Sequence, residues 1–341
     1  MSKILVTGGL GYIGSHTVVE LINAGFEPVI VDDLSNSQPK ILEQITKIAG
    51  RRPAFHQLDL SDEHAVQNLA TAEPDIAGVI HFAAFKAVGE SVQQPLKYYR
   101  NNIYSLINLL ESYYSKPINF VFSSSCTVYG QPDELPVTEQ APIKPAQSPY
   151  GNTKQIAEEI LSDTIAAGSP YKVIALRYFN PVGAHETALI GELPIGVPQN
   201  LVPFITQTAI GKREKLTVFG DDYNTKDGSC IRDYIHVVDL AKAHVAALRL
   251  MEKNEFKGYD VFNIGTGNGN TVLEIIKAFE RVTGEKLNYV IGPRRAGDIE
   301  QVWGNVSKAE EKLHWKAELG IDAMMSSAWA WEKYISQNPI Q

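Results

Sequence analysis

The chain has 341 residues, 44% hydrophobic and 21% charged, a composition typical of a globular protein with room for two domains and a large core. Its 39 acidic residues outnumber its 31 basic residues, and the net charge of −8 argues against a general nucleic-acid-binding protein. The two cysteines, Cys126 and Cys230, are too few for a disulfide framework or a metal cluster, so we expect no metal site. We find no signal peptide before the first predicted strand and no apolar run of membrane-spanning length, so we expect a cytoplasmic protein without a membrane partner.

The N-terminal stretch 3–16 predicts a buried strand, a tight turn and the start of a helix. Gly8, Gly11 and Gly14 are spaced G-x-x-G-x-x-G, a variant of the dinucleotide-binding pattern, in which side chains would block the turn and the approach of a pyrophosphate. Asp32 follows 18 residues after Gly14, at the end of the next predicted strand, where a carboxylate can hold the ribose hydroxyls of NAD. The alternative is a glycine-rich turn that binds nothing.

Strands and helices alternate over residues 4–123, which predicts a doubly wound parallel sheet of the Rossmann type. After the first strand, further strands are expected at 28–31, 54–58, 78–84 and 119–123, and helices at 17–24, 41–49, 63–70 and 96–114. Asp59, at the end of the third strand, could reach an adenine amino group or could cap the helix that follows.

The pattern changes from about Pro181, where proline and glycine become frequent and the periodicity breaks into short pieces. Helices return at 238–251, 272–283 and 322–334, and Thr271 and Glu274 have the spacing of a capping box. We therefore expect an NAD-binding Rossmann domain at 1–180 and a smaller mixed α/β substrate domain at 181–341. Elements at about 230–265 are expected to return to the first domain.

Tyr150 and Lys154 lie four residues apart and would share one face of a helix. A lysine beside a phenol is expected to lower its pKa, which would make Tyr150 a general base for a sugar hydroxyl while hydride leaves the same carbon. A serine cluster at 123–125 ends the preceding predicted strand, and a hydroxyl there could share the proton. Tyr-x-x-x-Lys alone is more typical of a surface pair, but the glycine loop, Asp32 and the serines make the set specific.

These motifs resemble the extended short-chain dehydrogenase/reductase family and, within it, the enzymes that invert C4 of UDP-hexoses. The resembling segments run through nearly the whole chain, at 7–16, 81–91, 98–102, 122–130, 148–154, 176–185, 227–236 and 293–298. The resemblance implies interconversion of UDP-galactose and UDP-glucose by oxidation at C4, rotation of the 4-keto sugar and re-reduction. NAD would remain bound as a resident cofactor, and the activity would belong to galactose metabolism.

The resemblance also implies roles for individual residues. The catalytic residues would be Tyr150, Lys154 and Ser125. The residues in contact with NAD would be these three and Gly8, Gly11, Tyr12, Ile13, Gly14, Asp32, Asp33, Leu34, Ser35, Asn36, Ser37, Asp59, Leu60, Phe82, Ala83, Ala84, Lys86, Asn101, Tyr178 and Phe179. The residues in contact with the UDP-sugar would be Lys86, Ser125, Tyr150, Asn180, Asn200, Leu201, Thr217, Val218, Phe219, Arg232, Arg295, Asp298 and Val302.

The residues after the serine cluster separate the candidate reactions. Nucleotide-sugar 4,6-dehydratases carry an Asp-Glu pair where this chain has Cys126 and Thr127, so dehydration is the less favoured alternative. A regulator that kept the fold and lost catalysis is disfavoured because Tyr150 and Lys154 are both present. Val302 stands where some relatives have tyrosine, and its smaller side chain predicts room for UDP-N-acetylhexosamines.

Several local residues have a structural alternative. Arg232 and Arg295 suit bidentate contacts with a diphosphate, although either could form a surface salt bridge. Phe179 and Phe219 could stack on a ring or belong to the core. The resemblance finally implies a homodimer formed by the helices at 96–114 and 150–167, a pairing that the sequence itself does not demonstrate.

Overall fold

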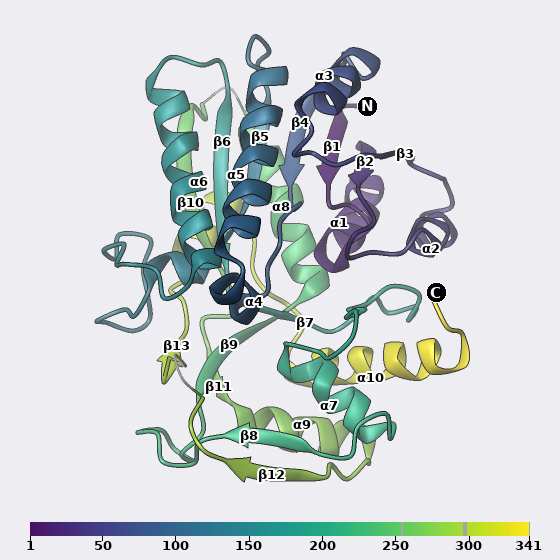
Figure 1. Cartoon of the computed structure of the whole chain (residues 1–341), viewed down its shortest axis with the longest axis vertical. Coiled ribbons are helices and arrows are strands. Elements are labelled where there is room, and N and C mark those ends of the chain that lie inside the picture. Colours follow the sequence, from purple (N-terminus) through teal and green to yellow (C-terminus); the bar gives the residue numbers. More distant parts are fainter. Residues whose placement is uncertain (254, 296–298, 341) are drawn as a thin grey trace.

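The computed structural model describes residues 1–253, 255–295 and 299–340. Its larger part is a seven-stranded sheet in the order β10-β6-β5-β4-β1-β2-β3, and every neighbouring pair is parallel (Figure 1). Its strands are β1 (Lys3–Thr7), β2 (Glu27–Asp32), β3 (Ala54–Gln57), β4 (Ile76–His81), β5 (Asn119–Ser125), β6 (Lys172–Tyr178) and β10 (Gly258–Ile264). The predicted doubly wound parallel sheet is confirmed.

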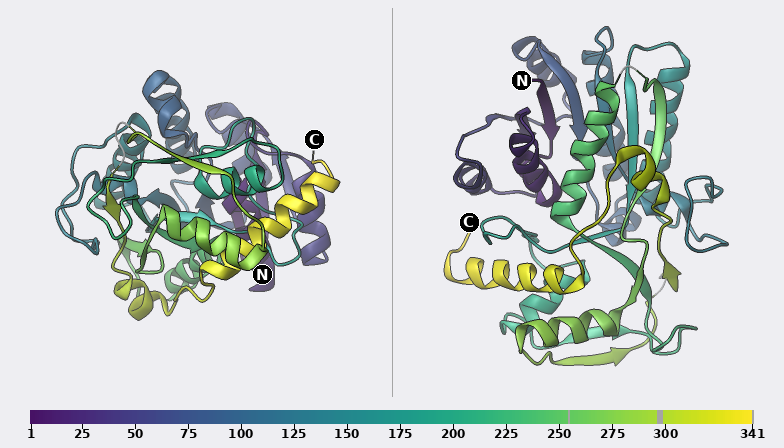
Figure 2. Two further views of the ribbon diagram at one scale, coloured as in Figure 1. Left: turned by 90° about the horizontal axis from the view of Figure 1, so that it is seen from below. Right: turned by 180° about the vertical axis from the view of Figure 1, so that it is seen from behind.

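Helices cover both faces of this sheet because parallel strands need crossover connections. One face carries α1 (Tyr12–Asn23), α2 (Lys40–Ala49) and α8 (Val237–Glu252), whose apolar residues share one core with β1 and β2. The other face carries α3 (Glu63–Ala72), α5 (Pro95–Ser112) and α6 (Pro149–Ala166), around a second core. Figure 1 shows α5 and α6 in front of the sheet, and the rear view in Figure 2 brings α8 forward.

The smaller part lies beyond the carboxyl ends of β1, β4 and β5 (Figure 1). Strand β9 (Ile231–His236) pairs in parallel with β7 (Asn180–Val182) and β13 (Gln301–Val302) and antiparallel with β11 (Gly269–Thr271). A separate parallel pair joins β8 (Leu216–Phe219) and β12 (Tyr289–Gly292). The helices here are α7 (Leu201–Ala209), α9 (Val272–Thr283) and α10 (Ile321–Gln337), so the predicted mixed α/β character is confirmed.

Short helical elements complete the chain. They are α4 (Val88–Gln93), the 3₁₀ turn η1 (Cys126–Tyr129) directly after β5, and the π-helical turn η2 (Ala309–Leu313). The capping box is confirmed, because the Thr271 hydroxyl accepts from the backbone of Glu274 and the Glu274 carboxylate accepts from the backbone of Thr271. Among the described residues, none of the helices combines the length and the hydrophobicity needed to cross a membrane.

One local prediction is extended and another needs correction. Helix α1 starts at Tyr12, directly after its N-cap Gly11, so the helix whose body was expected at 17–24 also includes Gly14 and the rest of its first turn. The cap of α3 is Asp62, whose carboxylate accepts from the backbone of Ala65, and Asp59 instead accepts from the backbone of Ser61 at 2.8 Å. The capping alternative for Asp59 is therefore wrong.

Candidate active site

The glycine turn between β1 and α1 forms the beginning of the site. Gly8 has a φ of +65°, and a Cβ on it would lie 3.0 Å from the backbone nitrogen of Ala83. A Cβ on Gly14 would lie 2.2 Å from the carbonyl oxygen of Gly8, so the helix can approach the turn this closely only with glycine there. Gly11 is the N-cap of α1 and has no side chain to accept from the first turn, which leaves its N–H groups for an anionic ligand.

Asp32 joins the glycine turn to the loop that follows β2. Its carboxylate is buried and accepts from the backbone N–H of Leu10 and Leu34, both at 3.0 Å, and from the Ser37 hydroxyl at 2.7 Å. Asp33 accepts from the backbone and hydroxyl of Ser35, at 2.9 and 2.7 Å. A fixed carboxylate here fits the ribose hydroxyls of NAD and would repel a 2′-phosphate, and the nearby helix N-terminus fits the pyrophosphate. The residues present therefore fit NAD.

The site lies at the point where the strand order reverses, between the carboxyl ends of β1 and β4, which is where open parallel sheets bind ligands. Thr7 Oγ1 and His81 Nδ1 lie 2.8 Å apart across this gap. Burial lowers the pKa of His81 to about 3, so its ring is neutral at physiological pH, as a structural histidine would be. Phe82, Ala83 and Ala84 follow directly after β4, beside the glycine turn.

Three further predicted cofactor residues contact other parts of the chain. The Tyr12 hydroxyl donates to the carbonyl oxygen of Gly183 at 2.7 Å and so ties α1 to the segment after β7. Lys86 Nζ lies 3.6 Å from a carboxylate oxygen of Glu192, and Asn101 donates to the side chain of Asn102. The remaining predicted residues differ in exposure: Leu60 is buried, Ile13 is partly buried and Asn36 is exposed.

The predicted catalytic residues meet where β5 ends and α6 begins. The Ser148 hydroxyl caps α6 by accepting from the backbone of Gly151 at 3.2 Å, which places Tyr150 in the first turn. Tyr150 lies beside Ser125, the last residue of β5, whose hydroxyl accepts from the backbone N–H of Thr127 at 3.2 Å. Lys154 Nζ donates to the carbonyl oxygen of Ser123 at 2.7 Å and lies 6.0 Å from the centre of the Tyr150 ring.

The expected lowering of the Tyr150 pKa is wrong for the protein on its own. Burial raises the pKa of Tyr150 to about 12, and the neighbouring Ser125 hydroxyl only partly opposes this effect. Burial also lowers the pKa of Lys154 to about 8. Both shifts have one cause, because removing water disfavours whichever form of the group is charged. Ionisation of Tyr150 therefore needs a further positive charge, such as an oxidised nicotinamide.

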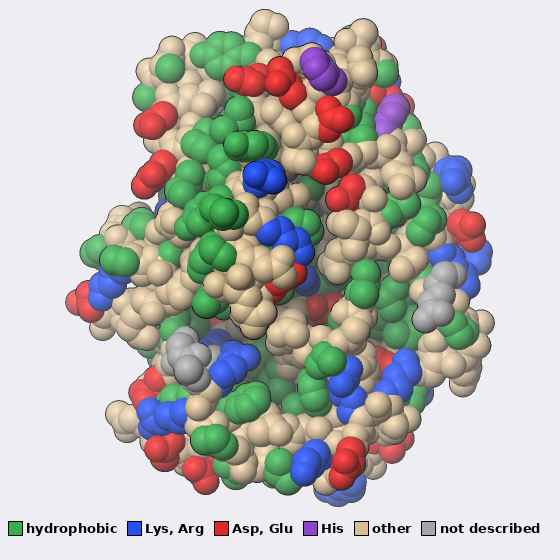
Figure 3. All heavy atoms as spheres, in the orientation of Figure 1, with side chains coloured by type: hydrophobic (Ala, Val, Ile, Leu, Met, Phe, Trp, Pro, Cys, Tyr) green, Lys and Arg blue, Asp and Glu red, His purple; other side chains and the backbone are tan. Residues whose placement is uncertain are grey.

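The predicted UDP-sugar residues lie in the smaller part and at its junction with the sheet. Asn180 donates to the carbonyl oxygen of Asp233 at 3.1 Å, and Arg232 Nη1 donates to the carbonyl oxygen of Ile231 at 2.8 Å. Val302 pairs with Arg232 between β13 and β9, and its side chain is buried. The face drawn in Figure 3 is hollowed between the part that carries the large sheet and the smaller part.

The other predicted substrate residues come from β8, α7 and the loop after β12. Asn200 precedes Leu201 at the start of α7 and donates to Glu192 Oε1 at 2.6 Å. Phe219 is 43% exposed, and the Arg295 guanidinium lies 5.8 Å from its ring centre, whereas the neighbouring Val218 is buried and Thr217 is partly exposed. Asp298 lies outside the described residues.

The two rings proposed for stacking differ. Phe179 is buried in a small cluster with Val302, and a Cβ on Gly304 would lie 2.4 Å from its ring. The Tyr178 hydroxyl is hydrogen-bonded to the side chain of Ser123. The Phe179 ring is therefore a core side chain, and Phe219 is the ring exposed for a ligand.

Three carboxylates beside these residues were missed in the sequence. Asp233 is fully buried and accepts from the backbone and hydroxyl of Thr266 and the backbone of Gly267. Glu192 lies between Lys86 and Asn200, and Glu158 follows Lys154 by four residues on α6. Charged residues inside apolar strands or on a helix face that carries Tyr150 and Lys154 are the signal that would have found Asp233 and Glu158.

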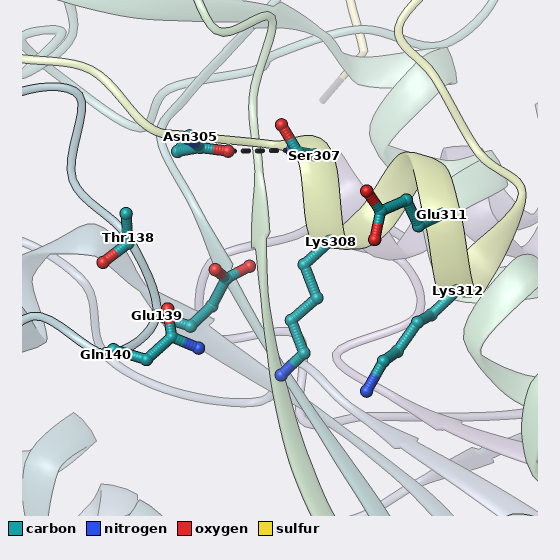
Figure 4. A pocket seen from close by; sticks show the side chains of 8 residues that line it. All are labelled: Thr138, Glu139, Gln140, Asn305, Ser307, Lys308, Glu311 and Lys312. Carbon is teal, nitrogen blue, oxygen red and sulfur yellow. Dashed lines mark hydrogen bonds between the residues drawn. The ribbon is translucent and has the colours of Figure 1, made fainter.

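A hollow elsewhere on the surface does not belong to this site. It lies between the loop after η1 and the turn η2, and none of the predicted site residues lines it (Figure 4). Its lining is polar and consists of Thr138, Glu139, Gln140, Asn305, Ser307, Lys308, Glu311 and Lys312. Within the described residues, no group of three or more His, Cys, Asp or Glu side chains is arranged to hold a metal ion.

Known proteins resemble this chain in sequence and in fold over nearly its whole length. The family model described as GDP-mannose 4,6 dehydratase matches residues 5–328. UDP-glucose 4-epimerase 2 of Arabidopsis thaliana is 51% identical over 99% of this chain and 96% of its own length. The crystal structure of UDP-glucose-4-epimerase from Stenotrophomonas maltophila, with bound NAD and formylated UDP-arabinopyranose, is 45% identical, with a TM-score of 0.95 over 99% of this chain and 100% of that one.

A second solved structure gives the same result. UDP-glucose 4-epimerase from Bifidobacterium longum, in complex with NAD+ and UDP, is 46% identical, with a TM-score of 0.92 and 99% of both chains covered. The matches extend from the glycine turn through the serine–tyrosine–lysine arrangement to the smaller part. The chain belongs to the UDP-glucose 4-epimerase family, within the extended short-chain dehydrogenases/reductases.

Proposed function

We propose that this enzyme interconverts UDP-galactose and UDP-glucose with NAD as a resident cofactor, and that Tyr150, Lys154 and Ser125 carry the reaction. The observation that supports these assignments most directly is that Ser125 ends β5 at the carboxyl edge of the sheet and that Tyr150 and Lys154 follow one another by one turn of α6, with Lys154 Nζ 6.0 Å from the centre of the Tyr150 ring. The glycine turn and Asp32 would hold NAD beside this edge. Bound NAD supplies the acceptor for the hydride at C4 of the sugar and returns that hydride later in the cycle.

Tyr150 takes the proton of the 4-hydroxyl group, and Ser125 holds the reacting oxygen through its hydroxyl. Lys154 contributes a positive charge within the same buried site, which favours the phenolate over the phenol. After the 4-keto sugar has turned over, Tyr150 returns the proton to the new hydroxyl. Arg232, Arg295 and Phe219 would anchor the UDP throughout, so that the sugar alone changes its orientation.

The dehydratase alternative requires an acid–base pair directly after Ser125. Cys126 and Thr127 occupy these positions in η1, and burial raises the pKa of Cys126 to about 12. A thiol with this pKa stays protonated at neutral pH and cannot serve as the base for C5, so inversion at C4 is the reaction that these residues support.

The test is an assay of dialysed protein with UDP-galactose and no added NAD, with Tyr150→Phe as the inactive control. We expect UDP-glucose to form without accumulation of NADH. Strict dependence on fresh NAD, with NADH accumulating in step with the sugar, would show a dehydrogenase instead. If the protein binds NAD and a UDP-sugar but does not interconvert the sugars, it is instead a regulator that kept the fold and lost catalysis.

A wider substrate range is favoured by Val302. Val302 is paired with Arg232 in the register of β13 and β9, its small side chain is buried, and we propose that the space at this position admits an N-acetyl group at C2. The measurement compares kcat/KM for UDP-galactose and UDP-N-acetylgalactosamine. Similar values support the proposal, and a ratio strongly against the acetylated sugar rejects it, whereas Val302→Tyr should exclude the acetylated sugar selectively.

We also propose a homodimer formed through α5 and α6. Leu96 and Tyr104 on α5 and Val88 and Val92 on the adjoining α4 expose large apolar side chains, which supports a partner on this face. Size-exclusion chromatography with light scattering should give twice the chain mass, and Leu96→Glu combined with Tyr104→Glu should give the monomer. A wild-type monomer would contradict the proposal. The cytoplasmic location stays a prediction.

A further inference from the structure

A buried ion pair lies one helical turn beyond Lys154. The Glu158 carboxylate on α6 accepts from Arg177 of β6, with Arg177 Nε 2.9 and 3.2 Å from the two carboxylate oxygens, and Nη2 binds one of the same oxygens. Both residues are nearly inaccessible to solvent, 8% and 5% exposed. A buried pair of this kind adds little net stability compared with apolar side chains of the same volume, so stability alone is a weak explanation for it.

Glu158 completes a series of contacts between α6 and β5. Tyr150, Lys154 and Glu158 are spaced by four residues and follow one face of the helix. Two of them bond consecutive residues of the strand, since Lys154 donates to the Ser123 carbonyl and Glu158 accepts from the Ser124 hydroxyl. The position of the helix along the strand is therefore fixed at two points, of which Glu158 is the one that touches neither a proposed substrate nor a proposed cofactor site.

Arg177 extends this connection to the turn that follows Ser125. Its Nη1 donates to the Tyr129 hydroxyl at 3.2 Å, and its guanidinium lies 4.9 Å from the centre of the Tyr129 ring. Tyr129 ends η1 and donates in turn to Asn263 Oδ1 of β10 at 2.6 Å. The pair thus links α6, β5, β6, η1 and β10 directly behind the proposed reacting groups.

Glu158 also acts on Lys154 through its charge. Burial lowers the pKa of Lys154, and the Glu158 carboxylate opposes this shift. The other groups around Lys154 are Tyr150 on its own helix, the Phe122 ring and the Ser123 carbonyl on β5, neutral His81 on β4 and, bonded to Ser123, Tyr178 on β6. Of these groups in the described chain, none is a carboxylate, so Glu158 supplies the negative charge that favours the ammonium form.

We propose that Glu158 is a positioning residue for the epimerase reaction, which keeps Lys154 charged and in register with Ser123 and thereby supports the ionisation of Tyr150. The inference rests on the proposed function, since Lys154 must carry its charge for Tyr150 to act as the base. It assigns a second role to the ion pair, beyond holding the sheet and helix together.

The test measures kcat for UDP-galactose between pH 6 and pH 10 in the NAD-loaded enzyme, for wild type, Glu158→Gln, Glu158→Asp and Glu332→Gln. Glu332 is a matched control, a buried carboxylate in the smaller part that accepts from Thr206 and Lys212 at 3.1 and 2.7 Å. We expect Glu158→Gln to move the alkaline limb of the profile to lower pH by about one unit, because Lys154 loses its proton earlier. Glu158→Asp should restore the limb at a reduced kcat, and Glu332→Gln should leave it unmoved.

If Glu158→Gln does not fold, the double variant Glu158→Gln/Arg177→Met removes the unpaired guanidinium and carries the same expectation. The inference is overturned if the alkaline limb of the kcat profile stays at the wild-type pH in the folded variant, whatever thermal stability is lost. The ion pair would then have a structural role alone. Failure of wild type to epimerise would overturn the proposed function instead, so the two failures are distinguishable.

Discussion

The large sheet and the smaller part hold their proposed ligand residues in different ways. At the carboxyl edge of the large sheet, Asp32, Ser125 and Lys154 are 7%, 8% and 4% exposed, and each is fixed by hydrogen bonds to neighbouring elements. In the smaller part, the Phe219 ring is 43% exposed and faces the Arg295 guanidinium. A reaction at one carbon needs groups fixed in place, whereas a nucleotide can be gripped by exposed side chains that close on it.

This difference divides the site into a rigid reacting edge and an adaptable anchoring part. Substitutions at the edge should act on kcat or on the retention of NAD. Substitutions in the smaller part should act on KM.

Tyr150→Phe should lower kcat by about 10²–10⁴-fold, because it removes the proposed general base while keeping the ring. The measurement is the rate of UDP-glucose formation from UDP-galactose. Tyr99→Phe is the matched control, since the Tyr99 hydroxyl on α5 accepts from Asn152 at 2.7 Å but does not contact Ser125 in the structure. Equal losses in the two variants would contradict a specific role for Tyr150.

Gly14→Ala should lower the NAD content of the purified protein by about tenfold or more, because the added Cβ forces α1 away from the glycine turn. The measurement is NAD released per chain on denaturation. Gly89→Ala is the control, because Gly89 also lies in a helix but nothing lies within 4 Å of a Cβ at that position. Full NAD content in Gly14→Ala would show that the turn does not hold the cofactor.

Arg295→Ala should raise KM for UDP-galactose about tenfold with little change in kcat, because it removes a contact made equally to the substrate and to the transition state. Steady-state kinetics checks this expectation. The adjacent Arg294→Ala serves as the control, since the Arg294 guanidinium donates to Asp222 at 2.6 Å and stacks on Tyr223. A fall in kcat with unchanged KM would place Arg295 in the reacting edge instead.

The junction of the two parts should make the fold sensitive to acid. Burial lowers the pKa of His16 on α1 to about 3 and of His236 on β9 to about 4. The unfolded chain then binds more protons below pH 6.5, so the free energy of unfolding should fall as the pH drops from about 6.5.

For His16 the fall should be about 1.4 kcal/mol per pH unit between pH 6 and pH 4. The free energy of unfolding, measured by urea titration at each pH, should therefore change less steeply with pH in His16→Gln than in wild type. His64→Gln, which changes an exposed histidine on α3, should keep the pH dependence of the wild-type free energy of unfolding. If this pH dependence is unchanged in His16→Gln, the lowering of the His16 pKa by burial is contradicted.

Most of the large sheet could be predicted from the sequence because its signals are local. Apolar runs that end at glycine or at an acidic residue locate β1, β2 and β3, and the spacing of Thr271 and Glu274 locates the start of α9. The β8–β12 pair could not be predicted in this way, because its strands are short and lie about seventy residues apart in the chain.

The candidate site divides in the same way. The glycine turn and the Tyr150–Lys154 pair follow from spacing, but the sign of the Tyr150 pKa shift does not, because it depends on how much water the folded protein removes. The positions of Glu158 and Asp233 could have singled them out in the sequence, but their hydrogen-bond donors could not be predicted, since only the fold brings these donors together.

The central claim is that the C4 hydrogen leaves and returns within one protein molecule while Tyr150 handles the proton. The most direct test converts UDP-galactose carrying deuterium at C4, without added NAD, and locates the label in the product by NMR. We predict UDP-glucose with the deuterium retained at C4. Loss of the label to solvent, or its appearance in free NADH, would contradict the account.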